Sequence, residues 1–151
     1  MDYTLPSRPT TMHKGHCGKI GIIAGSLDYP GAAILAGQAA LRTGSGVVYI
    51  LTTAAIRSMV IAAQPELIIY PLTPHPYMTI TAINTLRQAL DTLGITQLII
   101  GPGLGLHADT QAFILQAVCK TIPDYTIPTL IDADAITALC PNHVNKLANQ
   151  Y

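Results

Sequence analysis

The chain has 151 residues, of which 50% are hydrophobic and 11% charged, and eight basic and eight acidic residues give a formal net charge of zero. This length is about one domain, and the apolar excess excludes a disordered chain. The basic residues are too scattered to bind nucleic acid, and no uninterrupted apolar run reaches the roughly 18 residues of a membrane span. Residues 1–9 hold no apolar core of a secretory signal, so we expect a cytoplasmic protein with neither nucleic-acid nor membrane partners.

Three cysteines, Cys17, Cys119 and Cys140, lie far apart and lack CxxC spacing. An odd number in this pattern indicates free thiols in a reducing compartment, and we expect each to be a small buried apolar residue. The low charge also leaves little polar surface for a free monomer. It therefore predicts a homo-oligomer, or a partner that supplies a missing half.

After an irregular arm at 1–17, short apolar runs alternate with longer helical segments. Strands are predicted at 19–24, 47–51, 66–70, 98–100 and 128–132. Helices are predicted at 31–43, 53–63, 79–93, 109–120, 134–139 and 142–148. The expected caps are Thr52 or Thr53 for the second helix and Asp109 for the fourth. The three prolines within 71–77 predict a loop there.

Strands that alternate with helices of about 10–15 residues indicate βαβ units. The right-handed crossover rule then places helices on both faces of the sheet. The sequence therefore predicts an α/β fold with three αβα layers and a mostly parallel sheet. No linker or repeat divides the chain, so residues 1–151 are interpreted as one domain.

Ligands of open α/β sheets bind beyond the carboxyl ends of the strands, and three loops there carry useful chemistry. The first, at 25–31, has small residues and enters an Ala-rich helix, so it is either a ligand-contacting loop or an ordinary turn. It has neither the GxGxxG pattern nor a Walker A lysine.

The second loop is the GPGLG run at 101–105, which follows a strand and precedes a helix. Its glycines Gly101, Gly103 and Gly105 permit positive φ angles and close approach of a ligand to the backbone. Successive N–H groups here predict an anion-binding nest; the alternative is a tight loop chosen for its geometry. His107 follows directly and is a weaker candidate contact.

The third loop carries Asp132 and Asp134 at the end of a strand. Paired carboxylates in this place can hold Mg²⁺ or a ligand hydroxyl, although Asp134 also fits a helix N-cap. No histidine or cysteine pair has metal-ligand spacing, so no metal site is assigned from these residue types. A GxSxG nucleophile is absent, and the catalytic residue stays unknown.

Several motifs recur in this order in one known family. They are HKG at 13–15, IIAGS at 22–26, PGAA at 30–33, ALRTGSG at 40–46, PE at 65–66, IGPGLG at 100–105 and IDADA at 131–135. Over about residues 5–138 the chain resembles the ADP/ATP-dependent NAD(P)H-hydrate dehydratases of the ribokinase-like superfamily.

The resemblance implies a lyase that repairs hydrated NADH or NADPH. ADP or ATP with Mg²⁺ would phosphorylate the added hydroxyl, and loss of phosphate would restore the dihydronicotinamide double bond. Ala32 and Gly103 match the residues with which the family binds the hydrate. A side chain at Gly103 is therefore expected to disturb the ligand more than the fold.

The sequence also departs from the family. The nucleotide loop with its lysine and the Gly-Thr-Gly-Asp type motif with the catalytic aspartate are missing from these residues. The chain is therefore interpreted as the N-terminal half of an incomplete ribokinase-like domain that lacks catalysis by itself. Two alternatives stay open, a fragment of a small-molecule kinase of the same superfamily and a non-catalytic binding or assembly module. As the last strand before the missing half, 128–131 is expected to lie at or near an exposed sheet edge, favouring self-association.

Overall fold

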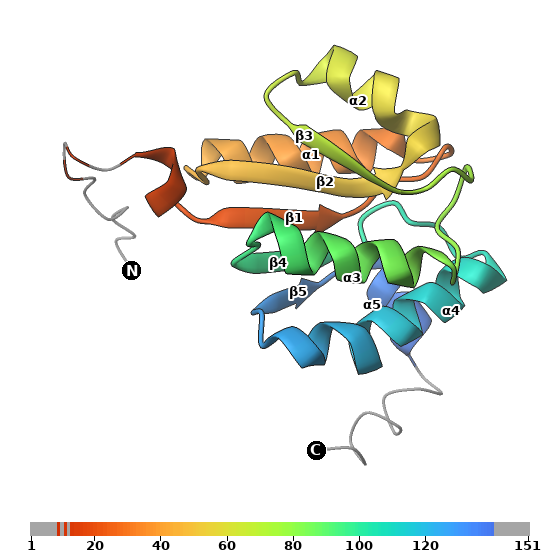
Figure 1. Ribbon diagram of the computed structural model, residues 1–151. Helices are drawn as coiled ribbons and strands as arrows, with labels where there is room; N and C mark the ends of the chain where they lie inside the picture. Colours follow the sequence, from red (N-terminus) through yellow and green to blue (C-terminus); the bar gives the residue numbers. More distant parts are fainter. Residues whose placement is uncertain (1–8, 10, 12, 141–151) are drawn as a thin grey trace, which may run out of the picture.

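The computed structural model describes residues 9, 11 and 13–140 of the chain. Its centre is a parallel five-stranded sheet in the order β3-β2-β1-β4-β5 (Figure 1). The strands are β1 Lys19–Ile23, β2 Val47–Thr53, β3 Ile68–Thr73, β4 Gln97–Ile100 and β5 Thr129–Ile131. The α-helices are α1 Pro30–Arg42, α2 Arg57–Ala63, α3 Ala82–Leu93, α4 Ala108–Gln116 and α5 Ala133–Leu139.

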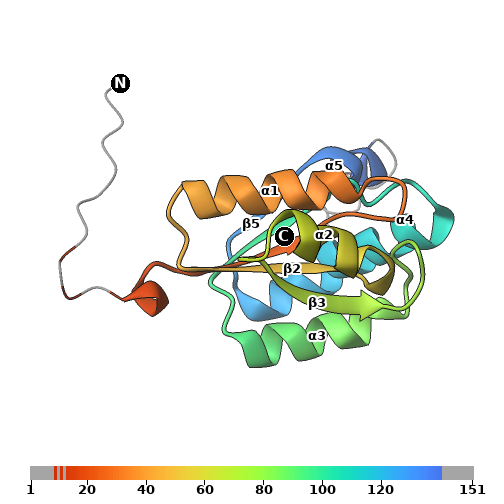
Figure 2. The ribbon, with the colours of Figure 1, turned by 90° about the horizontal axis from the view of Figure 1, so that it is seen from above.

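Helices cover both faces of this sheet, as Figure 2 shows from above, with α1 and α2 on one side and α3 and α4 on the other. Successive residues of a strand point to opposite faces. Ile22 and Ile50 therefore pack in the core beneath α1 and α2, whereas Ile23 and Leu51 pack in the core beneath α3 and α4. The predicted three-layer α/β fold with a parallel sheet is confirmed.

The third strand differs from its prediction. It begins at Ile68 and continues through Pro71 to Thr73, so the predicted loop at 71–77 starts too early. A proline lacks the N–H that a central strand needs, but an edge strand tolerates it. Because β3 is the outermost strand on its side of the sheet, Pro71 is compatible with it. The sequence pattern could not show this, because the order of strands in the sheet depends on contacts between segments that are far apart in the sequence.

The predicted helix caps are wrong in detail. Thr53 precedes a short 3-10 turn, Ala54–Ile56, but its hydroxyl makes no cap hydrogen bond and is buried without a partner among the described residues. The Thr52 hydroxyl instead donates to the carbonyl oxygen of Gly25 at 3.4 Å. Helix α4 begins one residue before Asp109, with His107 at its N-cap position. The helix predicted at 142–148 lies outside the described residues.

A glycine inside α1 sets how closely this helix approaches the sheet. A Cβ atom on Gly37 would lie 2.6 Å from Cδ1 of Leu67 and 3.2 Å from Cδ1 of Ile50, both core residues. Gly31, in the first turn of the same helix, has no heavy atom within 4 Å of its Cβ position. The two glycines therefore lie in the same helix, but Gly37 faces the core and Gly31 faces open space.

We predict that Gly37→Ala lowers the free energy of unfolding relative to Gly31→Ala by about 1–3 kcal/mol. The added methyl group overpacks the core at Gly37, whereas at Gly31 it meets open space and gains helix propensity. Urea unfolding followed by circular dichroism measures both variants. Equal stabilities would show that α1 does not depend on this close approach.

The cysteines are more exposed than the sequence predicts. Cys17 and Cys119 are half-buried and Cys140 is exposed, so the expectation that each is fully buried is wrong; all three are free thiols. Partial burial raises the pKa of the Cys119 thiol above its usual value, and the neighbouring Lys120 offsets this only in part. None of the helices in the described part of the chain is long and apolar enough to cross a membrane.

We predict that iodoacetamide modifies Cys119 more slowly than Cys140 at pH 7.5. The thiolate is the reactive species, so a raised pKa leaves less of it at a given pH, and partial burial also restricts access. Peptide mass spectrometry over a time course measures both rates. As the pH rises toward the pKa of Cys119, the rate of modification of Cys119 should approach that of Cys140. A rate ratio that does not change with pH, or a faster reaction of Cys119, contradicts the prediction.

Candidate functional site

The carboxyl edge of the sheet carries the loops that follow β1, β4 and β5. Strands β1 and β4 are neighbours, yet the chain proceeds from β1 toward β2 on one side and from β4 toward β5 on the other. Such a switch point leaves a crevice between two diverging loops, where ligands of open α/β folds bind. The three loops singled out in the sequence, at 25–31, 101–105 and 132–134, all lie at this edge (Figure 1).

Two hydrogen bonds join the glycine loop after β4 to the loop after β1. The Ser26 hydroxyl donates to the carbonyl oxygen of Gly103 at 2.9 Å. The N–H of Gly25 donates to the carbonyl oxygen of Pro102, also at 2.9 Å. Ser26 is only 3% exposed, so water competes little for its bond. The two loops therefore form one connected unit.

Gly103 lies directly against the first turn of α1. Its φ is +64°, and a Cβ atom there would be 2.6 Å from Cβ of Ala32 and 3.0 Å from the carbonyl oxygen of Tyr29. The fold therefore brings together Ala32 and Gly103, which are far apart in the sequence. It also means that a side chain at Gly103 would collide with the protein itself, so the expectation that such a substitution spares the fold is wrong.

The predicted anion nest does not form in the glycine loop. The N–H of Gly101 donates to the carbonyl oxygen of Ile23, that of Leu104 donates to Gly101, and that of Gly105 donates to Oδ2 of Asp134 at 2.8 Å. Pro102 has no N–H to offer. Gly103 is the one residue of this loop whose N–H has no acceptor among the described residues. The glycines serve loop geometry and close packing rather than a row of free donors.

The two aspartates after β5 have separate surroundings. Asp132 holds the N-cap position of α5 but makes no side-chain cap bond, and it is exposed. Asp134 lies within the first turn and accepts the bond from Gly105, so its predicted role as a cap is wrong. Between them Ala133 has a φ of +47°, which costs an L-residue about 1–2 kcal/mol. Backbone strain of this kind gathers at functional sites.

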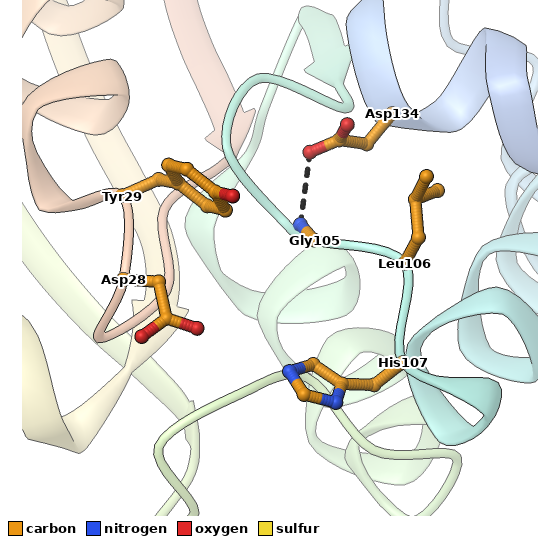
Figure 3. A pocket seen from close by; sticks show the side chains of 6 residues that line it. All are labelled: Asp28, Tyr29, Gly105, Leu106, His107 and Asp134. Carbon is orange, nitrogen blue, oxygen red and sulfur yellow. Dashed lines mark hydrogen bonds between the residues drawn. The ribbon is translucent and has the colours of Figure 1, made fainter.

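A pocket of about 520 Å³ opens between these loops (Figure 3). It is lined by Asp28, Tyr29, Gly105, Leu106, His107 and Asp134. The carboxylates of Asp28 and Asp134 can accept hydrogen bonds from hydroxyl or amide groups. The N-terminal ends of α1 and α4 also meet the pocket, since Tyr29 and His107 hold their N-cap positions without side-chain cap bonds.

One aromatic contact brings a fourth loop to the pocket. The rings of Tyr77 and His107 stack with centroids 4.4 Å apart and planes 20° apart. Tyr77 belongs to the segment between β3 and α3, which a hydrogen bond from the N–H of Leu27 to the carbonyl oxygen of Pro76 also ties to the first loop. His107 is thereby held in place at the mouth of the pocket.

Sequence reasoning found the loops but missed several pocket residues. Asp28 and Tyr29 lie within the first loop, yet nothing in their spacing marks them, and Leu106 resembles any exposed apolar residue. Tyr77 and His107 lie far apart in the sequence, and only the tertiary structure shows their contact. Of the hydrate contacts expected from the sequence, only Gly105 lines this pocket; Ala32, Gly101, Gly103 and Asp132 do not. Within the described residues, no group of three or more His, Cys, Asp and Glu side chains could hold a metal ion.

Comparisons with known proteins agree with this architecture. The sequence profile of the NAD(P)H-hydrate dehydratase family matches residues 20–150. An ATP-dependent (S)-NAD(P)H-hydrate dehydratase from Heterostelium pallidum is 36% identical over 142 residues, which cover 90% of this chain and 32% of that protein. The bifunctional NAD(P)H-hydrate repair enzyme Nnr from Dictyoglomus turgidum is 35% identical over 88% of this chain and 25% of that protein.

Solved structures give the same result. A ribokinase-like protein from Enterococcus faecalis superposes with a TM-score of 0.71 at 26% identity, over 88% of this chain and 43% of that one. The ADP/ATP-dependent NAD(P)H-hydrate dehydratase from Bacillus subtilis, co-crystallised with ATP/Mg²⁺, superposes with a TM-score of 0.63 at 31% identity, over 87% of this chain and 43% of that one. The chain thus spans less than half the length of the relatives it matches.

We predict that Asp134→Ala lowers the free energy of unfolding by about 1.5–3 kcal/mol, because the N–H of Gly105 loses a charged acceptor. Asp132→Ala is the matched control. It removes a carboxylate two residues away that makes no side-chain cap bond to α5 in the part of the chain that the structure describes, so its effect should stay within about 0.5 kcal/mol. Chemical unfolding of both variants measures the difference, and equal effects would show that Asp134 does not hold the loop.

Proposed function

The chain belongs to the NAD(P)H-hydrate dehydratase family, and from that premise we propose that it forms the substrate-binding part of an ATP- or ADP-dependent enzyme that dehydrates hydrated NADH or NADPH. Residues 1–151 are then part of one ribokinase-like domain. The proposed hydrate contacts are Ala32 and Gly103, with Gly101, Gly105 and Asp132 as further candidates in the neighbouring loops.

The observation that carries this proposal is the close approach of Gly103 to Ala32 at the switch point, where a Cβ atom on Gly103 would lie 2.6 Å from Cβ of Ala32. The family resemblance assigns both residues to hydrate binding, although they lie in different βαβ units. A shared ligand requires them to be neighbours in space, and they are. The N–H of Gly103, which has no acceptor among the described residues, is a donor available to that ligand.

The chemistry of the adjacent pocket also supports a hydrated nicotinamide nucleotide. Such a ligand presents a flat adenine ring, a carboxamide and several hydroxyl groups. The rings of Tyr29 and His107 offer flat apolar surfaces, and the carboxylates of Asp28 and Asp134 accept hydrogen bonds from hydroxyl and amide donors. The half-buried Tyr77 stacks on the exposed His107 and keeps its imidazole ring oriented.

ATP or ADP with Mg²⁺ would supply the phosphoryl group that turns the added hydroxyl into a leaving group. The described residues of this chain do not fit that role, because they contain no metal-binding cluster and no lysine in the glycine loop. The proposed function of this chain is therefore to bind and orient the hydrate. The phosphoryl-transfer step and the catalytic aspartate are assigned outside these residues.

We predict that the purified chain binds hydrated NADH but does not convert it to NADH when ATP or ADP and Mg²⁺ are added. In nitrogen–proton correlation spectra, the amide signals of Gly25, Gly103 and Gly105 should shift on titration with the hydrate. The amide signals of Gly18 and Gly94, which lie just before the amino-terminal ends of β1 and β4, should not shift. The absorbance of the dihydronicotinamide ring reports turnover in the same samples.

A pair of variants tests the assigned contact. Ala32→Val enlarges the side chain that touches Gly103 and should weaken hydrate binding about tenfold, whereas Gly31→Val, in open space one residue earlier, should not. Shifts confined to other loops would refute the assigned site. Nucleotide-dependent recovery of the dihydronicotinamide absorbance would refute the proposal that this chain binds the hydrate without converting it. Binding of a small alcohol in place of the hydrate would favour the kinase alternative.

A further inference from the structure

The edge of the sheet at which the pocket opens carries more acidic than basic side chains. Four carboxylates follow strands or begin helices at this carboxyl edge: Asp28, Asp109, Asp132 and Asp134. Lys19 at the start of β1 and Arg42 at the end of α1 lie at the opposite edge. Arg57, at the start of α2, lies toward the carboxyl edge but does not line the pocket. The pocket therefore opens where negative charge is in excess.

Inside the pocket, no lysine or arginine among the described residues balances the two lining carboxylates. Figure 3 shows Asp28 on one side of the opening and Asp134 on the other. One oxygen of Asp134 accepts from the N–H of Gly105. Asp28 is exposed and has no hydrogen bond or ion pair with another described residue. The carboxylate of Asp28 is thus available to meet a ligand.

The two helix ends at the pocket do not reverse its negative charge. A helix N-terminus carries a partial positive charge of about half a unit. Helix α1 has few donors to offer there, because Pro30 lacks an N–H and the N–H of Ala32 donates to the carbonyl oxygen of Tyr29. Helix α4 carries Asp109 in its first turn, which offsets its dipole. The two full charges of the lining carboxylates therefore outweigh the helix ends.

A negative pocket accepts only the uncharged parts of a dinucleotide hydrate. The pyrophosphate is repelled by the carboxylates and must lie outside. The proposed hydrate contact at Gly103 is two residues from Gly105, which lines the pocket, so the nicotinamide end is the part that reaches it. The amino group of its carboxamide can donate to Asp28, and the imidazole of His107, held by the stack on Tyr77, can donate to the amide oxygen.

We propose that the pocket selects the carboxamide of the hydrated nicotinamide ring and that Asp28, with Asp134, rejects a carboxylate in its place. The rejected ligand is the hydrate of reduced nicotinic acid adenine dinucleotide, which carries –COO⁻ instead of –CONH₂ and is called the acid hydrate below. Asp28 is the main selective residue, because Asp134 already serves the N–H of Gly105. The substrate class is thereby narrowed to amides.

This inference rests on the proposed function, since it takes the hydrate to bind at Ala32 and Gly103. The test measures by titration calorimetry how tightly the purified chain binds hydrated NADH and the acid hydrate. At pH 8 carboxylates are ionised and histidine side chains carry little charge. Both ligands have the same pyrophosphate and adenosine, so the ratio of their dissociation constants reports only the exchanged group.

We expect the acid hydrate to bind at least about tenfold more weakly than hydrated NADH. Raising the salt concentration from about 0.05 M to about 0.5 M should narrow this ratio, because salt screens exposed charges. Asp28→Asn removes the charge with little change in size and should lower the ratio about tenfold, mainly by tighter binding of the acid hydrate. The matched control is Asp109→Asn, which removes a carboxylate at the same edge that does not line the pocket. It should change the ratio by less than about twofold.

Equal binding of the two hydrates would overturn this inference and leave the proposed function standing. Equal effects of Asp28→Asn and Asp109→Asn would overturn the assignment of selectivity to the pocket. So would binding of hydrated NADPH at least about tenfold more weakly than hydrated NADH, because the additional 2′-phosphate lies at the adenosine end and its repulsion would place that end in the pocket. Failure of the unaltered chain to bind either hydrate would refute the proposed function, and this inference with it.

Discussion

The site depends on the junction between the loops after β1 and β4. The hydroxyl of the buried Ser26 and the N–H of Gly25 bond the carbonyl oxygens of Gly103 and Pro102, and Gly103 then lies against Ala32 with no room for a side chain. Because β1 and β4 are adjacent strands whose chains diverge, this junction is the point at which the two halves of the sheet meet. The junction positions the pocket residues that follow β1, Asp28 and Tyr29, against those that follow β4, Gly105–His107.

This junction explains why the loop at 101–105 is rich in glycine. A phosphate-binding loop would keep its N–H groups free, but here the loop amides are mostly used to join β1, the loop itself and Asp134. The loop therefore has its backbone fixed by hydrogen bonds and does not form an anion-binding site. A loop held in this way suits a ligand that is recognised by shape and by a few hydrogen bonds, as a nicotinamide ring with its carboxamide would be.

The fold also ties the site to the exposed edge. Helix α5 begins directly after β5, and its first turn carries Asp134, which holds the N–H of Gly105 at the pocket. Ala133, at the start of the same helix, has a positive φ of +47°. The position of Gly105 at the pocket therefore depends on the turn that joins β5 to α5.

The sequence by itself determined the alternation of strands and helices, the three candidate loops and the family, because hydrophobic period, glycine placement and ordered motifs are local properties of the chain. Only the tertiary structure decided the strand order, and with it three things. Pro71 is tolerated at an edge, Asp134 serves Gly105 rather than its own helix, and Asp28, Tyr29 and His107 share one pocket. These depend on contacts between residues far apart in the chain, and no local pattern encodes which elements become neighbours.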